Sequence, residues 1–565
     1  MRSFDPNPES VVTAARGQMV HRDALDHTSR LERRLYTVRP GVWNLVGNGL
    51  SNQTFIDAPE GIIAIDTGES IEEMRSALVD LRTVTDRPIA AVVYTHFHYV
   101  SGTKEILNEF GSDVPIFGHE RITFNRHRAM SEVGPAYARG LVHQFGTAMP
   151  LDGPDGLVSV GLGMFYRNPD HRPFNDGFVP PTNVWRGGEH TTIAGTRVEV
   201  THAPSDADDS VTLWFPDLET CVHNIVWPVL FNIFAIRGEE YRDPQVLLRG
   251  FDHIVDLSPS YLVGTHGPPI IGREEILRRV TGSRDAIQFL WDQTVRGLNK
   301  GWTADKIAEN VRLPDSCDDD YLTQELYGVA EHHVRQICAG IRGWFDGDPA
   351  KLFPLPPADR AERLIDGFGG ATAVVDRVND ARRDGDLRWA LELASWLVTR
   401  SGSTSEDRSR LADVLREIGY RSSAANIRNW CITTARDLDG STDLSRLRQH
   451  RLREGQVLAM APIDSLRILR VMLDPELAIG VDHHIAFDFV GGGSVGLHVR
   501  RGIAVTTDGV DAPDRVAIPF EVWARILSGS VALSDALAST DVTVTGSAKA
   551  VITTLAAFEN QGLRS

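Results

Sequence analysis

Two short apolar runs on either side of an amphipathic segment constrain the fold of this chain more than any other feature. The first run, "GIIAIDTG", begins at Gly61, and the second, "IAAVVYTH", ends at His96. Each is typical of a buried strand that ends in polar residues. The segment between them, "SIEEMRSALVDLRTVT", has its apolar residues at helical spacing. This order predicts a layered α/β domain with its functional residues on loops at the strand ends.

Three regions of different character follow one another along the chain. Short β-rich runs such as "QTFIDA", "TRVEVTHAP" and "VTLWFPD" continue to about residue 272, and amphipathic helical segments such as "LRWALELASWLVTR" then continue to about residue 437. A charged stretch, "RDLDGSTDLSRLRQHRLREGQ", predicts a linker before a small α/β region with "HIAFDFVG" and "AVITTLAAFEN". We therefore expect three domains, at residues 1–272, 273–437 and 456–565.

Composition narrows the function classes. The 565-residue chain has a formal net charge of −18, which argues against nucleic acid or an anionic membrane surface as a partner. It contains no apolar stretch of 18 residues and no apolar signal region, so we expect no stable membrane anchor. The four cysteines are scattered, with no CxxC pair, as is typical of a reducing compartment. We expect a cytoplasmic protein.

A pair of histidines marks a candidate metal site. His96 and His98 stand two residues apart in "YTHFHYVSG", where a buried strand is expected to end. Because side chains alternate along a strand, both imidazoles can point to one side and bind one cation. The alternative is a structural histidine pair, since a chain with 19 histidines can contain this spacing by chance.

The chain resembles the bacterial alkylsulfatases, which are zinc-dependent type III sulfatases with a metallo-β-lactamase fold. The catalytic block carries "GIIAIDTG", "VVYTHFH" and "FAIRGEEYRD", and the helical block, with "DQTVRGLNKG" and "GWFDGDPAKLFPLPP", is similar to the family's dimerisation domain. The tail from "MAPIDSLRILRVML" is similar to its sterol-carrier-like domain, which is thought to gather hydrophobic substrate. The resemblance implies an αββα sandwich, then an α-helical dimerisation domain and a small α/β sterol-carrier-like domain. It also implies a homodimer.

The resemblance extends the candidate ligand set beyond the two histidines. A Glu stands ten residues before the Pro of the "WFP" motif in the family, and Asp206 stands there in "THAPSDADDSVTLWFP". Asp206 is therefore the expected third ligand and His202 the alternative, although the loop could be only a solvated turn. His266, in "VGTHGPP", matches a histidine that serves the family's second metal, but it could equally hydrogen-bond a backbone carbonyl.

Other positions depart from the family's two-zinc pattern. The family's HxHxDH motif gives an Asp and a His to the second zinc, and this chain has Val100 and Ser101 there. Asn224, beside His223, stands at the place of the bridging Glu. We therefore expect one divalent metal ion per chain. The family favours zinc, while two His and one carboxylate would also suit iron.

The resemblance also suggests residues for substrate. Arg237 and Arg296 match sulfate-binding arginines, although each could form a structural salt bridge instead, and His332 matches the proposed general acid, although it could be a buried helix histidine. We expect apolar pocket walls from Tyr99, Tyr327, Trp227 and Phe231.

The sequence leaves three functions open. The first is a metal-dependent hydrolase that cleaves a sulfate ester, or a related ester, of an apolar alcohol. Its partners would be a hydrophobic small molecule, which can be anionic, and a second copy of the chain. The alternatives are a single-iron redox or elimination enzyme on the same scaffold, and a catalytically degenerate relative that binds lipid.

Overall fold

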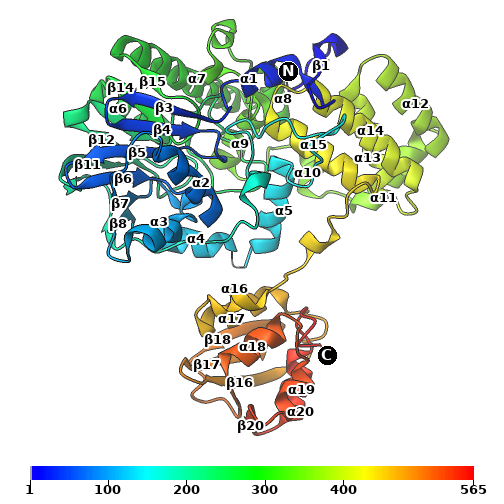
Figure 1. Cartoon of the computed structure of the whole chain (residues 1–565). Helices are drawn as coiled ribbons and strands as arrows, with labels where there is room; N and C mark the ends of the chain where they lie inside the picture. Colours follow the sequence, from blue (N-terminus) through cyan, green and yellow to red (C-terminus); the bar gives the residue numbers. More distant parts are fainter. Residues whose placement is uncertain (1–2, 131, 565) are drawn as a thin grey trace. The chain divides into compact units, whose positions relative to one another are not determined.

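The computed structural model describes residues 3–130 and 132–564. The part described leaves out residues 1, 2, 131 and 565. The first expected domain begins, and the last one ends, among these residues. The chain divides into two compact units, one of residues 1–126 with 139–443 and one of residues 127–138 with 444–565 (Figure 1). Among the described residues, no helix combines the length and the apolar character that crossing a bilayer requires.

Two β-sheets packed face to face form the centre of the first unit. The seven-stranded sheet has the order β3-β4-β5-β6-β7-β8-β9, and the six-stranded sheet runs from β10 to β15 in order. Ile63 and Val93 of the first sheet join Leu213 and Val263 of the second in one buried cluster. The strands are β3 (Arg34–Arg39), β4 (Val42–Val46), β5 (Gln53–Ala58), β6 (Gly61–Ile65), β7 (Ile89–Val93), β8 (Ile116–His119), β9 (Asn183–Trp185), β10 (Glu189–Ile193), β11 (Thr196–His202), β12 (Val211–Phe215), β13 (Thr220–His223), β14 (Tyr261–Gly264) and β15 (Ile270–Ile271).

Helices cover the outer faces of both sheets. The strands β6, β7 and β8 are parallel, and α2 (Ile71–Leu81) and α3 (Thr103–Phe110) are the crossover helices between them (Figure 1). On the other side, α6 (Pro244–Leu257) packs its Phe251 with Leu262 of β14 in a second cluster. This order of layers is the αββα sandwich, so the predicted fold class is confirmed.

Local sequence explains the central strand–helix–strand unit. The strand β6 is buried along its whole length, which is why its sequence is continuously apolar rather than alternating. The helix α2 begins after Ser70, whose side chain accepts a hydrogen bond from the backbone N–H of Glu73. The chain between these elements is short, so the polar residues at the ends of β6 and β7 fall at one edge of the sheet.

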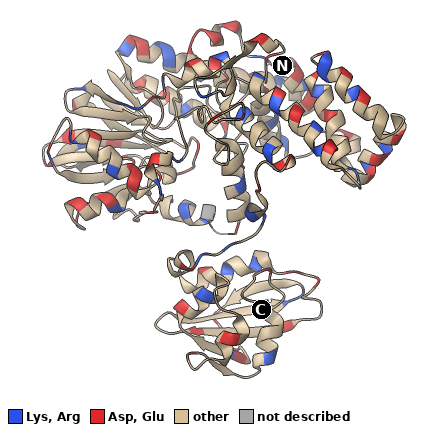
Figure 2. Cartoon of the chain, turned by 45° about the vertical axis from the view of Figure 1, so that its right-hand side comes forward, with Lys and Arg blue, Asp and Glu red and all other residues tan. Residues whose placement is uncertain are grey.

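The helical part of the chain belongs to the same compact unit as the sheets. Ile287 and Leu290 of its first helix share a cluster with Leu262 and Phe251. Charged residues of both signs lie along the later helices, and Arg382 pairs with Glu417 at 2.6 Å between α12 and α14 (Figure 2). The helices are α7 (Arg273–Asn299), α8 (Ala304–Asn310), α9 (Ala330–Arg342), α10 (Pro349–Leu352), α11 (Pro357–Gly367), α12 (Ala371–Arg383), α13 (Leu387–Thr399), α14 (Ser405–Arg421) and α15 (Ala425–Leu438).

The second unit is built around a five-stranded sheet of order β18-β17-β16-β19-β20. Trp523 fills its core against Phe487 and Phe489. Its strands are β16 (Asp482–Phe489), β17 (Gly493–Arg500), β18 (Ile503–Thr507), β19 (Asp514–Ile518) and β20 (Thr543–Thr545). Its helices are α16 (Glu454–Leu458), α17 (Pro462–Leu469), α18 (Phe520–Leu527), α19 (Leu533–Ala538) and α20 (Ala548–Leu555).

Candidate metal centre

The ends of strands from both sheets meet at one group of polar residues. His96 and His98 follow β7, and Asp206 lies in the loop between β11 and β12. The backbone N–H of Val211 donates to the carbonyl of Thr95 over 3.0 Å, which fixes the loop before β12 against the segment after β7. The structure therefore brings together three residues that the sequence analysis placed in the candidate site.

The three side chains fit a divalent metal ion. Asp206 Oδ2 lies 3.1 Å from His98 Nδ1 and 3.6 Å from His96 Nε2, and all three atoms lie within 4.8 Å of one another. Tetrahedral ligands at zinc distances of about 2.0–2.2 Å stand about 3.3–3.6 Å apart, so these separations suit one ion. His96 Nε2 is buried with no hydrogen-bond partner, as expected of an atom that donates to a metal.

A buried relay orients His96. The hydroxyl and the backbone N–H of Thr95 both donate to the Asp66 carboxylate, over 2.7 and 2.9 Å. Because the Thr95 hydroxyl hydrogen is used there, its oxygen accepts from His96 Nδ1, 2.9 Å away. That tautomer leaves the lone pair of His96 on Nε2, toward Asp206. Burial raises the pKa of Asp66 to about 6.

Asn224 orients Asp206. Its Nδ2 donates to Asp206 Oδ1 over 2.5 Å, and its Oδ1 accepts from the indole N–H of Trp227 at 3.4 Å. Asp206 Oδ2 is thereby left facing His96 and His98. Burial alone would raise the pKa of Asp206, but the two histidines outweigh burial and hold the pKa well below its usual range. Asp206 is therefore an anionic candidate ligand whose amide partner adds no charge.

The positions that would serve a second metal are engaged elsewhere. Val100 is fully buried, and Ser101 accepts a hydrogen bond from Arg126 over 2.8 Å. His266 donates from Nδ1 to the carbonyl of Leu50 at 3.0 Å, so its Nε2 accepts from the Tyr99 hydroxyl at 3.2 Å. The bond to the Leu50 carbonyl is compatible with both interpretations of His266, because a metal-binding histidine also donates its other ring N–H to such a group. Burial lowers the pKa of His266 to about 4, which keeps it neutral.

His202 and Arg296 do not join the site. His202 is exposed at the end of β11, where its Nε2 bonds the carbonyl of Asp208 at 2.6 Å and its ring stacks on His119. The alternative ligand is therefore engaged with Asp208 and His119 rather than with His96, His98 and Asp206. Arg296 is exposed on α7 and bonds Gln293 at 3.2 Å. Its helical neighbours Thr294 and Gly297 face the core, which turns Arg296 outward.

His332 has different surroundings from those expected of a residue at the metal centre. It lies in the first turn of α9, with its ring edge-to-face to Phe234 at 5.6 Å. Burial lowers its pKa, and its Nδ1 is buried without a hydrogen-bond partner. Within the described part of the chain, no contact of His332 reaches the three ligand residues.

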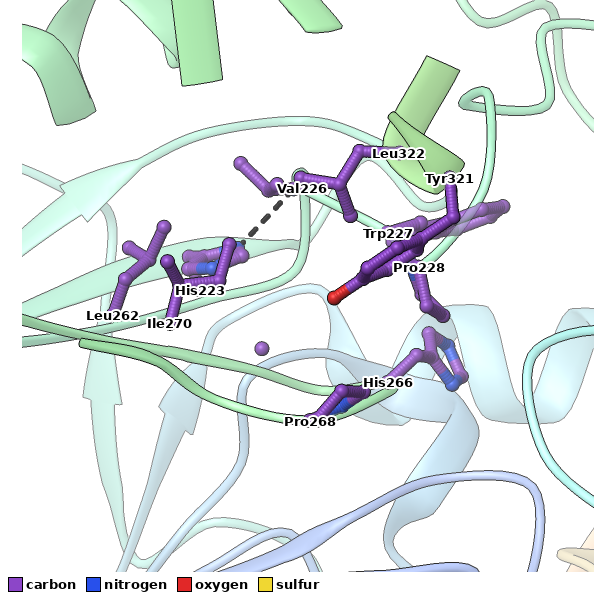
Figure 3. Close-up of a pocket in the computed structure, with 11 residues that line it drawn as sticks. His223, Val226, Trp227, Pro228, Leu262, His266, Pro268, Ile270, Tyr321 and Leu322 are labelled. Atoms are coloured by element: carbon purple, nitrogen blue, oxygen red, sulfur yellow. Dashed lines mark hydrogen bonds between the residues drawn. The ribbon is translucent and has the colours of Figure 1, made fainter. Parts of the chain in front are cut away.

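The four expected wall residues are buried close to the site. The ring of Trp227 lies 4.3 Å from that of Phe231 in a tilted arrangement and meets Tyr327 edge-to-face at 5.9 Å. The rings of Tyr99 and Trp227 lie 5.4 and 5.5 Å from that of His266. Figure 3 shows residues that line a small cavity, among them His266 and Trp227. The cavity has a volume of about 10 Å³. A space of that size holds roughly one water molecule, so it is not a substrate pocket.

Arg237 is buried beside the site with a partner that the sequence analysis missed. Its Nε and Nη2 donate to one oxygen of Glu239, over 2.9 and 2.6 Å. The same oxygen lies 3.8 Å from His98 Nε2. Burial alone would raise the pKa of Glu239, but Arg237 outweighs it and holds the pKa at about 2. Nothing in the run "RGEE" distinguishes the buried Glu239 from the exposed Glu240.

Arg242 is a second buried arginine that the sequence analysis missed. Its guanidinium donates to the backbone carbonyl of Asn232 over 2.6 Å and to that of Asp206 over 3.4 Å. It lies over the rings of Trp227 and Phe231 at 5.6 and 5.9 Å. Within the described chain no carboxylate comes within 4.0 Å of it, and its Nε has no partner. The site therefore holds one arginine paired with a carboxylate and one paired only with carbonyls.

The chain is similar to two described families and to known proteins over much of its length. The family described as alkyl sulfatase dimerisation matches residues 303–441, and the metallo-beta-lactamase superfamily matches residues 46–222. A linear primary-alkylsulfatase of Pseudomonas sp. (strain ATCC 19151) is 34% identical over 89% of this chain and 98% of its own length. An (R)-specific secondary-alkylsulfatase of Pseudomonas sp. is 27% identical over 79% of this chain and 68% of its own.

A solved structure matches the fold over nearly the whole chain. It is the stereoselective inverting sec-alkylsulfatase Pisa1 from Pseudomonas sp., with a TM-score of 0.83 and 24% identity. The match covers 94% of this chain and 86% of that one. The sandwich and the helical domain therefore share one established architecture with that enzyme.

Proposed function

This chain belongs to the alkylsulfatase family of metallo-β-lactamase-fold hydrolases, and from that premise we propose that it cleaves a sulfate ester, or a related ester, of an apolar alcohol at a single divalent metal ion. His96 Nε2, His98 Nδ1 and Asp206 Oδ2 would hold the ion. The ion would supply a Lewis acid that polarises the ester or acidifies a water molecule. Zinc is favoured by the family, and the same donors would also accept iron.

The observation that carries the single-ion proposal is the hydrogen bond between Asn224 Nδ2 and Asp206 Oδ1, at 2.5 Å. A carboxylate at position 224 would face the Asp206 carboxylate and would need a further cation between them. The amide donates instead, so the site is electrostatically complete with one ion. The bond from Tyr99 to His266 supports the same proposal, because it uses the lone pair that a second metal would need.

The surrounding residues support an apolar ester with a negatively charged head. Trp227, Phe231 and Tyr327 offer apolar surface. The buried Arg242 offers positive charge next to the metal ligands, whereas Glu239 occupies two donors of Arg237 and offsets its charge. His332 remains our candidate for protonating the leaving group on the strength of the resemblance alone, because its lowered pKa disfavours the protonated form and its ring contacts Phe234 rather than the candidate ligands. We further propose that residues 456–565 act as a carrier for hydrophobic substrate. No observation favours the redox alternative, and the complete ligand trio speaks against a degenerate site.

Metal analysis of the purified protein tests the proposal. We expect one zinc ion per chain by mass spectrometry, together with hydrolysis of dodecyl sulfate that stops when the metal is chelated and returns when zinc is added. His98→Ala and Asp206→Ala should each reduce the bound metal to below about a tenth of the wild-type content, since each removes a ligand. Ser101→Ala, the matched control, should keep one ion. Two ions per chain in the unmodified protein would contradict the single-ion proposal.

A further inference from the structure

The guanidinium of Arg237 is already occupied by a carboxylate of the same chain. Two of its nitrogens donate to Glu239 Oε2, and both side chains are buried, with 6% and 14% of their surfaces exposed. The loop that carries them is fixed by the hydrogen bond from the Arg237 backbone N–H to Gln144 at 3.2 Å. An arginine held in this way cannot offer the same donors to an external oxyanion without releasing Glu239.

Glu239 also faces the metal ligands. Its Oε2 lies 3.8 Å from Nε2 of His98, the ligand whose Nδ1 faces Asp206. Arg242, on the other hand, has no carboxylate partner within the described chain. Glu239 therefore cancels one of the two positive charges that Arg237 and Arg242 place beside the metal ligands.

We propose that Glu239 is a specificity-determining residue that makes the site select singly charged, sulfate-type head groups over doubly charged, phosphate-type ones. This proposal takes one assumption from the proposed function, which is that the anionic head group binds next to the metal ligands. Glu239 is a resident anion beside that place, and its repulsion grows in proportion to the charge of the ligand. It therefore weakens the binding of a dianion by about the square of the factor by which it weakens the binding of a monoanion.

The test measures the binding of two non-hydrolysable probes, decanesulfonate with one charge and decylphosphonate with two, at pH 9 to the metal-loaded protein. In Glu239→Gln the dissociation constant should fall about tenfold for the sulfonate and about a hundredfold for the phosphonate. The control is Glu240→Gln, which removes the same charge from the exposed neighbouring position and should change neither constant more than about twofold.

A second variant separates charge from shape and covers the case in which Glu239→Gln folds poorly. Glu239→Asp keeps the charge. The ratio of the dissociation constants for phosphonate and sulfonate in this variant should therefore stay within about threefold of the wild-type ratio. Three results would overturn the proposal. The dissociation constants of both probes could change equally in Glu239→Gln, or Glu239→Asp could bind phosphonate ten times more tightly than wild type does. The third is that no folded variant binds either probe. Because neither probe is hydrolysed, a protein that fails to cleave alkyl sulfates would contradict the proposed function and leave this comparison intact.

Discussion

Val100, Ser101 and Asn224 stand at the three positions where the resemblance to alkylsulfatases places ligands of the second zinc. In the structure Val100 packs in the core. The Ser101 hydroxyl accepts a hydrogen bond from Arg126, and the Asn224 amide donates one to Asp206. Each side chain has a role of its own, and none can donate an anionic oxygen to a metal. The difference from a two-metal site is therefore local to these side chains.

Restoring the three ligands should restore the second ion. We expect the variant Val100→Asp, Ser101→His, Asn224→Glu to raise the zinc content from one toward two per chain, since it supplies two carboxylates and an imidazole around His266. The second ion must displace the Tyr99 hydroxyl from His266 Nε2, which is a loss of one hydrogen bond. Ser101→His alone is the control and should stay at one ion. A folded triple variant that still binds one ion would show that other residues set the stoichiometry.

At the scale of elements, the parts with strong local patterns could be predicted from the sequence. The strand β5 spans the predicted "QTFIDA", and β6, α2 and β7 fall within the predicted segments. The pair His96 and His98 could be placed because a strand leads directly into it. The exposed position of Arg296 could not be predicted in the same way. Which face of α7 is buried depends on the tertiary contacts of its core residues, and the sequence of the helix does not give those contacts. Glu239 and Arg242 carry no local signal, since charged residues look alike in sequence whether they are buried or exposed.

The helix α9 is attached to its surroundings through Glu331. Its carboxylate accepts hydrogen bonds from Ser3 at 2.6 Å and from Arg388 of α13 at 2.7 Å. Burial alone would raise the pKa of Glu331, but Arg388 and Ser3 outweigh it and lower the pKa to about 2. The carboxylate therefore stabilises the fold fully above its unfolded pKa of about 4.5, and this contribution is lost as the pH falls toward 2.

Glu331→Gln should expose this contribution. At pH 7 we expect the free energy of unfolding to fall by about 1–3 kcal/mol, because the hydrogen bonds to a charged group are lost. The difference in the free energy of unfolding between this variant and wild type should narrow steadily between pH 5 and pH 3. Urea unfolding at several pH values measures it, with Glu309→Gln, an exposed position on α8, as the control. A gap that stays constant with pH would contradict the assignment.

At the scale of the whole molecule, the helical region has side chains that one chain leaves exposed. Trp344 and Phe353, in the segment between α9 and α11, have exposed fractions of 72% and 86%. Both lie within residues 303–441, which match the alkyl sulfatase dimerisation family. Large aromatic side chains at such exposure are typical of a surface that another chain covers.

We therefore expect a homodimer in which this segment is buried. Light scattering on the purified protein at micromolar concentration should give about twice the mass of the 62.3 kDa chain. Trp344→Glu with Phe353→Glu should shift the mass toward that of one chain, because burying two carboxylates in an apolar interface is costly. The circular dichroism spectrum should stay unchanged, and the control Val510→Glu, at an exposed apolar position of the second unit, should leave the dimer intact. A wild-type protein that is monomeric, or a double variant that remains a dimer, would show that the segment does not hold two chains together.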